Sequence, residues 1–229
     1  MPADPTRYDR QSTILPTDKL QTAKAVVIGV GAIGRQVALQ LSACGIGELH
    51  IVDFDTVDIV NVGPQGFAPV DIGKKKVTAL LADCERLNPG RTVEHDMRYC
   101  DAVKGNIYFC CVDSIKTRGQ IFDEVSKIPG TELFIDARMS AETMRIVVED
   151  NFVVPTYSKT LFEASEAFQG SCTAKSTIFT ANIAAGLMVS QYSKFLRRMP
   201  LDKDFNLNLL SMELFSTPTA MAMAGAMAG

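Results

Sequence analysis

Short apolar runs alternate with helical stretches along the first 140 residues. The runs "AKAVVIGV", "ELHIVDFD", "NIYFCCV" and "ELFIDAR" are typical of buried strands, and "RTVEHDMR" is a further predicted strand. Between them, "RQVALQLSACG", "GKKKVTALLADCERLNPG" and "SIKTRGQIFDEVSKI" have apolar residues at helical spacing, and the first of these helices is expected to end at Gly45. This alternation predicts an α/β fold with a Rossmann-like, mostly parallel sheet that has helices on both faces.

The pattern changes after Arg138. "TMRIVVED" and "FVVPTY" lie close enough in the chain to form an antiparallel pair, a long helix is expected near residues 176 to 197, and "FNLNLLSMEL" is a last strand or short extended segment. We therefore expect one domain over residues 1–216. Its nucleotide-binding half covers 1–140, and its substrate-side half, with antiparallel strands, covers 141–216.

Composition restricts the class of protein. The chain has 229 residues, a net charge of −3 and 21% charged residues, which argues against a nucleic-acid-binding surface. The most apolar helix, "STIFTANIAAGLMVSQYSKFL", is interrupted by Asn182, Ser190, Gln191 and Lys194, so we expect a core helix and no membrane span. With no signal peptide recognisable at its start, the chain is expected to be cytoplasmic.

Cysteine and histidine offer little obvious chemistry. The six cysteines are scattered and form no CxxC pair, so we expect reduced thiols and no zinc site. The two histidines, His50 and His95, both fall in predicted strands. We interpret them as structural, because no triad partners are nearby.

A glycine-rich turn marks a nucleotide site. Gly29, Gly31 and Gly34 form G-x-G-x-x-G between the first predicted strand and the first helix, where backbone N–H groups and the helix dipole receive phosphate. Asp53 ends the next predicted strand, where a carboxylate accepts the hydroxyls of an adenosine ribose. The alternative is that the glycines serve only close strand–helix packing, and Asp53 argues against it.

Two further features favour ATP over a nicotinamide dinucleotide. A triphosphate with Mg²⁺ requires an additional lysine and an additional carboxylate. "DIGKKKV" places Lys74, Lys75 and Lys76 at a predicted helix start, and Asp113 follows the strand "NIYFCCV". Taken separately, these residues are equally consistent with a solvated lysine run and a helix N-cap.

Five motifs in this order resemble one family, the ubiquitin-activating-enzyme-like (ThiF/MoeB/HesA) adenylyltransferases. They are "RYDRQ" at 7–11, "GVGAIG" at 29–34, "DFDTVDIVNVGPQ" at 53–65, "DIGKKKV" at 71–77 and "CVDSIKTR" at 111–118. The resemblance covers about the first 140 residues well and the remainder loosely. It implies ATP-dependent adenylation of the C-terminal carboxylate of a ubiquitin-like or sulfur-carrier protein, or of a peptide, with release of pyrophosphate.

The resemblance also implies residue roles and partners. At the nucleotide it places Gly29, Gly31, Ala32 and Gly34 in the phosphate loop, Asp53 at the ribose, Asp55 and Asn61 at the phosphates and metal, Gln65 in support of that loop, Lys76 at the triphosphate, and Asp113 at Mg²⁺. Arg10 would reach the γ-phosphate of the neighbouring protomer, which implies a homodimer with shared active sites. The carrier or peptide substrate would end in glycine.

The chain departs from the family pattern in two places. Many relatives have an arginine where this chain has Pro64, and Arg35 is the cation we expect to compensate. The zinc-binding CxxC pairs of many relatives are missing. Cys172 in that region is interpreted as a structural thiol, with a thioester-forming nucleophile as the alternative.

Two alternatives to an active adenylating enzyme remain at this stage. Pro64 is consistent with a catalytically impaired scaffold or regulatory half of such an enzyme, and the glycine-rich turn alone is consistent with an NAD-dependent oxidoreductase. Residues 217–229, "TPTAMAMAGAMAG", are expected to form a flexible tail. The alternative for this tail is a pseudo-substrate that occupies the cleft of another protomer.

Overall fold

One mixed sheet organises the chain in the computed structural model, which describes residues 5–161 and 176–216. The strands are β1 Lys24–Ile28, β2 Glu48–Asp53, β3 Thr92–Asp96, β4 Ile107–Cys110, β5 Leu133–Ser140, β6 Thr143–Glu149, β7 Asp204–Asn208 and β8 Glu213–Ser216. Their order across the sheet is β3-β2-β1-β4-β5-β6-β7-β8. The first five strands are parallel, and β6, β7 and β8 are antiparallel to their neighbours, as expected for a Rossmann-like fold with an antiparallel C-terminal part.

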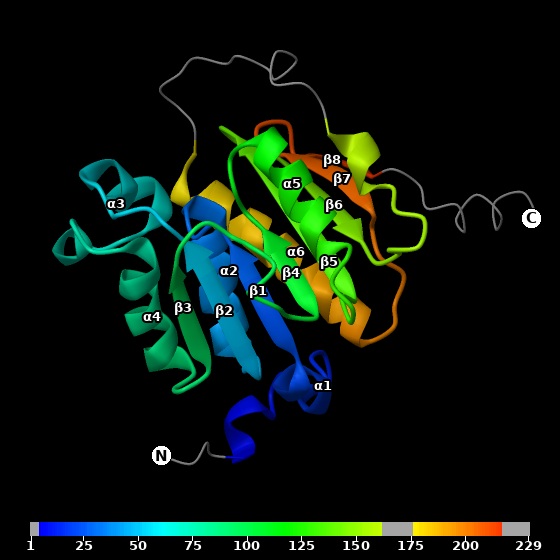
Figure 1. The fold of residues 1–229 in the computed structure, drawn as a ribbon, viewed down its shortest axis with the longest axis horizontal. Helices are drawn as coiled ribbons and strands as arrows, with labels where there is room; N and C mark the ends of the chain where they lie inside the picture. The colour runs from blue at the N-terminus through cyan, green and yellow to red at the C-terminus, as the bar shows by residue number, and fades with distance from the viewer. Residues whose placement is uncertain (1–4, 162–175, 217–229) are drawn as a thin grey trace, which may run out of the picture.

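Helices cover both faces of the sheet (Figure 1). They are α1 Thr17–Thr22, α2 Ala32–Cys44, α3 Ile59–Gln65, α4 Lys76–Leu87, α5 Ile115–Val125 and α6 Ile178–Leu196, with short 3₁₀ turns η1 Pro5–Tyr8, η2 Pro69–Asp71 and η3 Tyr157–Thr160. The α2, α4 and α6 helices pack on one face and α5 on the other. No helix in these two described ranges is both long and apolar enough to cross a membrane.

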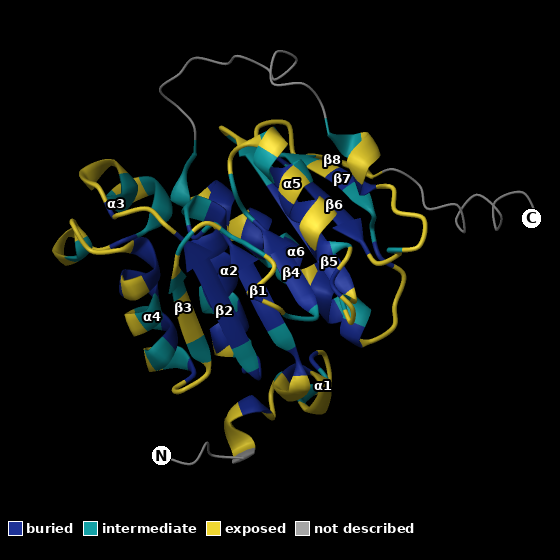
Figure 2. Ribbon diagram, viewed as in Figure 1, coloured by how far each residue is buried: buried dark blue, intermediate teal, exposed yellow. Residues whose placement is uncertain are grey.

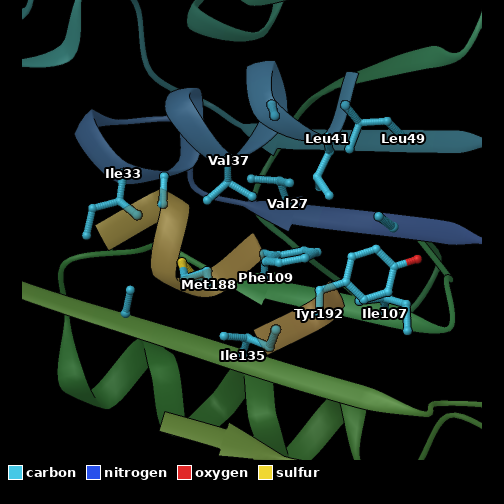
Figure 3. Packing of buried hydrophobic residues seen from close by; sticks show 14 of the residues in the cluster. Val27, Ile33, Val37, Leu41, Leu49, Ile107, Phe109, Ile135, Met188 and Tyr192 are labelled. Carbon is cyan, nitrogen blue, oxygen red and sulfur yellow. The ribbon is translucent and has the colours of Figure 1, made fainter. Parts of the chain in front are cut away.

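The larger core lies between the sheet and the α2–α4–α6 layer. Val37 and Leu41 of α2 and Met188 of α6 pack against Val27 and Phe109 of the central strands, as Figure 3 shows. Burial is greatest in these central strands, whereas the β3 and β8 edges are largely exposed (Figure 2). The short continuous apolar runs of the sequence are therefore the central strands, which are covered on both faces.

One strand pairing predicted from the sequence is wrong. "FVVPTY" forms no strand, and β6 pairs with β5 on one side and β7 on the other. The Glu149 carboxylate instead accepts hydrogen bonds from the backbone N–H groups of Asn151, Thr156 and Tyr157, which curls this segment into a loop. "FNLNLLSMEL" contains two strands of a hairpin, β7 and β8, where a single strand or extended segment was expected.

Candidate functional site

A large cavity opens at the carboxyl edge of the sheet, where the parallel strands end. Its volume is about 1140 Å³, larger than the roughly 300–1,000 Å³ of most small-molecule sites, so it has room for more than one small ligand. Its walls come from the β1–α2 turn, the ends of β2 and β4, the α5 helix and the turn between β5 and β6. Ligands of open α/β sheets bind at this edge.

The three glycines of the β1–α2 turn have different roles. Gly29 has a φ of +83°, and a Cβ on Gly34 would lie 1.8 Å from the Gly29 carbonyl oxygen, so both residues are required by the turn itself. A Cβ on Gly31 would meet only Gln65 Nε2, at 3.9 Å. Gly31 is the N-cap of α2 and provides no side-chain acceptor, so the first N–H groups of α2, at Ala32 and beyond, face the cavity without a side-chain cap.

Asp53 organises the neighbouring backbone as well as lining the cavity. Its Oδ2 accepts a hydrogen bond from the Val30 N–H and its Oδ1 from the Asp55 N–H, both at 2.8 Å. A carboxylate has about four acceptor positions, so capacity remains for ligand hydroxyls. The expected ribose role is thus compatible with the observed contacts.

Only one lysine of the lysine run faces the cavity. Lys76, the first residue of α4, is buried and its Nζ lies 3.0 Å from Asp55 Oδ2. Lys74 pairs with Asp71, and Lys75 with Asp96, outside the cavity. The structure therefore brings together Lys76 and Asp55, as predicted, and separates the other two lysines from the site.

The α3 helix presents Gln65 to the cavity. Gln65 Oε1 is buried without a hydrogen-bond partner among the described residues, which leaves an acceptor available to a ligand. Asn61 does not line the cavity: its Oδ1 accepts a hydrogen bond from the Asp58 N–H at 2.8 Å, as part of a capping box. Pro64 lies in the last turn of the same helix.

Asp113 is exposed and lines the cavity directly after β4, as its position in the sequence predicted. The described residues contain no group of three or more side chains able to hold a metal. Mg²⁺ in nucleotide sites is typically bound by one or two carboxylates together with phosphate oxygens. Asp113 and Asp55 fit that donor set.

Arg35 is held away from the cavity, contrary to the expectation that it compensates there for Pro64. Its Nη2 lies 2.6 Å from Asp83 Oδ2 on α4, and its guanidinium stacks on the Phe67 ring at 5.1 Å. Arg35 is buried and does not line the cavity. Because α2 and α4 pack side by side, the guanidinium next to the glycine turn faces the helix layer instead of the ligand.

Arg10 lies at the far end of α2 from the glycine turn. The neighbouring Gln11 donates from Nε2 to the Cys44 carbonyl, and the Tyr8 ring packs against Gly45 just after the helix ends. The α2 helix has 13 residues and is thus about 20 Å long, which separates Arg10 from its own cavity. Cys172 and the 217–229 tail lie outside the described residues.

The histidines form a pair, and neither lines the cavity. His50 Nδ1 and His95 Nε2 are 2.7 Å apart, and His50 Nε2 lies 2.7 Å from Glu48 Oε1. Burial lowers the pKa of both imidazoles. Burial likewise raises the pKa of the cavity-lining Cys111 thiol, which makes it a poor nucleophile.

Several cavity residues escaped the sequence analysis. Met97, Arg98 and Tyr99 follow β3, and the Arg98 guanidinium lies 4.1 Å from the centroid of the Phe54 ring at the cavity wall. Arg118 lines the cavity from α5. Met97, Arg98 and Tyr99 lie just beyond the carboxyl end of β3, and no motif marked them. Arg118 is the last residue of the motif "CVDSIKTR", but the sequence analysis gave it no role.

The order of strands and the glycine-rich turn define a Rossmann-like α/β protein. The chain belongs to the ThiF family, whose model matches residues 8–225. "Ubiquitin-like modifier-activating enzyme 5" of Rattus norvegicus is 24% identical over 214 residues, covering 82% of this chain and 53% of that protein. "Adenylyltransferase and sulfurtransferase MOCS3-1" of Zea mays is 34% identical over 113 residues, covering 46% of this chain and 24% of that protein. The chain thus spans about half the length of the rat enzyme and about a quarter of the length of the maize protein.

Solved structures share the fold. Escherichia coli MccB with MccA-N7isoASN superposes with a TM-score of 0.77 at 20% identity, over 94% of this chain and 72% of that chain. PaaA superposes with a TM-score of 0.73 at 18% identity, over 92% of this chain and 68% of that chain. These similarities extend through the antiparallel C-terminal part, which the sequence resemblance covered only loosely.

Proposed function

We propose that the chain binds Mg·ATP in this cavity and adenylates the terminal carboxylate of a ubiquitin-like protein, a sulfur-carrier protein or a peptide ending in glycine. One observation carries the proposal. The lining of a single cavity includes the uncapped start of α2, Lys76, Asp113 and the β5–β6 turn. The α2 end offers a phosphate site, and the region at the β5–β6 turn offers space for an extended chain end. MccB, which shares the fold, has been solved with ATP.

The reaction requires no proton transfer. A carboxylate oxygen bonds to the α-phosphorus, the bond from that phosphorus to the oxygen bridging to the β-phosphate breaks, and pyrophosphate leaves with the electron pair. Lys76 and the first N–H groups of α2 would hold the departing phosphates, and Asp53 the ribose. Mg²⁺ when bound supplies positive charge to the phosphate oxygens, and Asp113 and Asp55 would hold it.

The proposal includes a homodimer with shared sites. Arg10 lies too far along α2 to serve its own cavity, so its expected contact with the γ-phosphate requires a second protomer. The neighbouring helices α3 and α6 expose large apolar side chains, Ile59, Val60 and Phe179, that a partner would cover.

The test is ATP–pyrophosphate exchange with candidate carriers and peptides that end in glycine. We expect exchange with the wild-type chain and at least about a hundredfold loss in Lys76→Met and Asp113→Ala. Lys74→Met is the matched control, because Lys74 pairs with Asp71 at the surface and should leave the rate unchanged. Exchange that persists in both site variants would contradict the proposed assignment.

A second candidate function is a scaffold or regulatory subunit that binds ATP without adenylating a carrier. Two observations favour the scaffold function. Pro64 stands where the family resemblance leads one to expect an arginine, and Arg35 forms an ion pair with Asp83. ATP binding without exchange, for every carrier tested, would support the scaffold. Binding of NAD in preference to ATP would support an oxidoreductase instead.

A further inference from the structure

A buried cluster of charged side chains lies at the cavity where β4 ends beside β5. At its centre is Asp136 of β5, which is fully buried. Its carboxylate accepts hydrogen bonds from Arg118 Nη1, from Arg138 Nε at 2.8 Å and from the Tyr157 hydroxyl at 3.1 Å. One carboxylate is thus shared between two guanidinium groups, and its charge does not neutralise Arg118 alone.

Arg118 retains donors that are not used within the described chain. It is 4% exposed and lines the cavity. Its hydrogen bonds within the described chain come from Nη1, to Asp136 and to the Cys110 carbonyl at 3.5 Å. Its Nε is buried without a partner among the described residues. A buried guanidinium with unused donors is costly unless an acceptor is supplied, and an oxyanion matches its planar fork best.

The order of strands places Arg118 within the site. Along the carboxyl edge, β2 carries Asp53, β1 leads to the glycine turn, and β4 leads to Asp113. Arg118 contacts the last residue of β4, Cys110, and its neighbour in β5, Asp136. The next feature along this edge is the β5–β6 turn, which also lines the cavity. Arg118 therefore lies between the phosphate region and the region that would receive an extended chain end.

We propose that Arg118 binds the terminal carboxylate of the acyl substrate and positions it for attack on the α-phosphorus. The inference rests on the proposed function. Lys76 and Gln65 lie on the α3–α4 side, where pyrophosphate would leave, and Arg118 lies on the β4–β5 side. In-line displacement requires the attacking carboxylate opposite the leaving group, and within residues 5–161 and 176–216 Arg118 is the buried cation on that side. The Asp136 carboxylate accepts a hydrogen bond from Arg118 Nη1 and so fixes the position of the guanidinium.

The experiment compares two small probes that differ only in charge at the chain end. N-acetylglycylglycine and its C-terminal amide are titrated against the whole chain, with an ATP analogue that has a methylene group between the α and β phosphorus atoms and Mg²⁺ present. Binding is followed by calorimetry or chemical-shift changes. We expect the wild-type chain to prefer the acid over the amide by about tenfold or more, the value of one charge-assisted hydrogen bond.

Arg118→Gln should reduce this preference to about one, while affinity for the amide and for the analogue stays unchanged. Arg145→Gln is the matched control, because Arg145 also pairs with a carboxylate, Asp204, but does not line the cavity. Arg118→Lys keeps the charge but loses the fork, and should retain part of the preference. If Arg118→Gln does not fold, the acid-over-amide preference of Arg118→Lys is measured instead.

The outcomes separate this inference from the proposed function. A wild-type chain that does not bind the analogue refutes the proposed function. Analogue binding with no acid preference, or an acid preference that survives in both Arg118 variants, overturns the role of Arg118. Loss of analogue affinity together with the acid preference would identify Arg118 as a phosphate contact, which also overturns the carboxylate assignment.

Discussion

At the residue scale, the glycines of the β1–α2 turn serve two purposes. Gly29 and Gly34 are needed for folding, and Gly31 is needed for access of the ligand to the backbone. We predict that Gly34→Ala destabilises the protein by about 3 kcal/mol, because its methyl group would overlap the Gly29 carbonyl. Gly31→Ala should leave stability nearly unchanged and weaken ATP binding by roughly tenfold, since the methyl group occupies space that phosphate needs. Chemical denaturation and ATP titration measure the two effects.

Gly63→Ala in α3 is the control for these substitutions. A Cβ there meets nothing within 4 Å, so the change should be neutral or stabilise by about 0.5–1 kcal/mol. If Gly31→Ala unfolds the protein as severely as Gly34→Ala does, the distinction between the two glycines is wrong.

The histidine pair predicts a dependence of stability on pH. Glu48 can only accept from His50 Nε2–H, and when both rings are neutral His50 Nδ1 accepts from His95 Nε2–H. Burial lowers both pKa values below the ordinary value of about 6.5. The unfolded chain therefore binds more protons as pH falls below about 6.5, and the free energy of unfolding decreases there.

Replacement of both histidines by glutamine should flatten this dependence. We expect the wild-type chain to lose more stability than His50→Gln/His95→Gln between about pH 7.5 and about pH 5.5 in urea denaturation. Most carboxylates titrate below this window. Equal losses in the two proteins would show that the pair carries no proton linkage.

The residues of the site show what a motif can and cannot predict. Asp53, Asp113 and Lys76 line the cavity as expected, because a strand end or a helix start determines where they point. Arg98 was missed, and Arg118 was quoted only as part of a motif and given no role, since the contacts of both residues depend on neighbours from other strands. Arg35 was misassigned for the same reason: Asp83, distant in sequence, takes its guanidinium.

At the element scale, Asn61 caps the start of the α3 helix outside the cavity. Its Oδ1 accepts a hydrogen bond from the Asp58 N–H. We predict that Asn61→Asp keeps the cap and the free energy of unfolding within about 0.5 kcal/mol, whereas Asn61→Ala should lose about 1 kcal/mol because the cap is removed. ATP titration should give the wild-type affinity for Asn61→Asp. A tenfold weaker affinity would contradict a purely capping role and would support the phosphate contact that the family resemblance implies.

The misassigned partner of β6 also belongs to this scale. Proximity in sequence favoured "FVVPTY", and loop closure does favour local pairing. In the folded chain both edges of β6 are occupied, by β5 and by β7, and the Glu149 carboxylate holds the following segment as a loop. Val153 in this loop is 90% exposed, so its apolar character did not indicate burial.

At the scale of the whole molecule, the position of Arg10 predicts active sites completed in trans. Arg10→Ala and Asp113→Ala should each be inactive in exchange. When equal amounts of the two variants are mixed and exchange subunits, about half of the dimers should be mixed. Each mixed dimer contains one intact site of two, so the mixture should recover about a quarter of wild-type activity. Sedimentation measures the dimer independently.

Two results would contradict the shared site. A mixture that stays inactive, although sedimentation shows mixed dimers, would mean that Arg10 does not act across the interface. An Arg10→Ala protein with wild-type activity would remove Arg10 from the site altogether. Asp9→Ala is a neighbouring exposed substitution that should change neither activity nor assembly.

The sequence by itself determined the parallel strands, the helices between them and the glycine turn, because hydrophobic period and turn chemistry are local properties. It also determined which side chains stand at strand ends. Only the tertiary structure decided which partners those side chains meet: Asp55 for Lys76, Asp83 for Arg35, and Asp136 for Arg118. Charge pairing between strands and helices depends on distances in space, which the order of residues along the chain does not determine. The position of Arg118 at the cavity, beside Asp136, was therefore decided only by the tertiary structure.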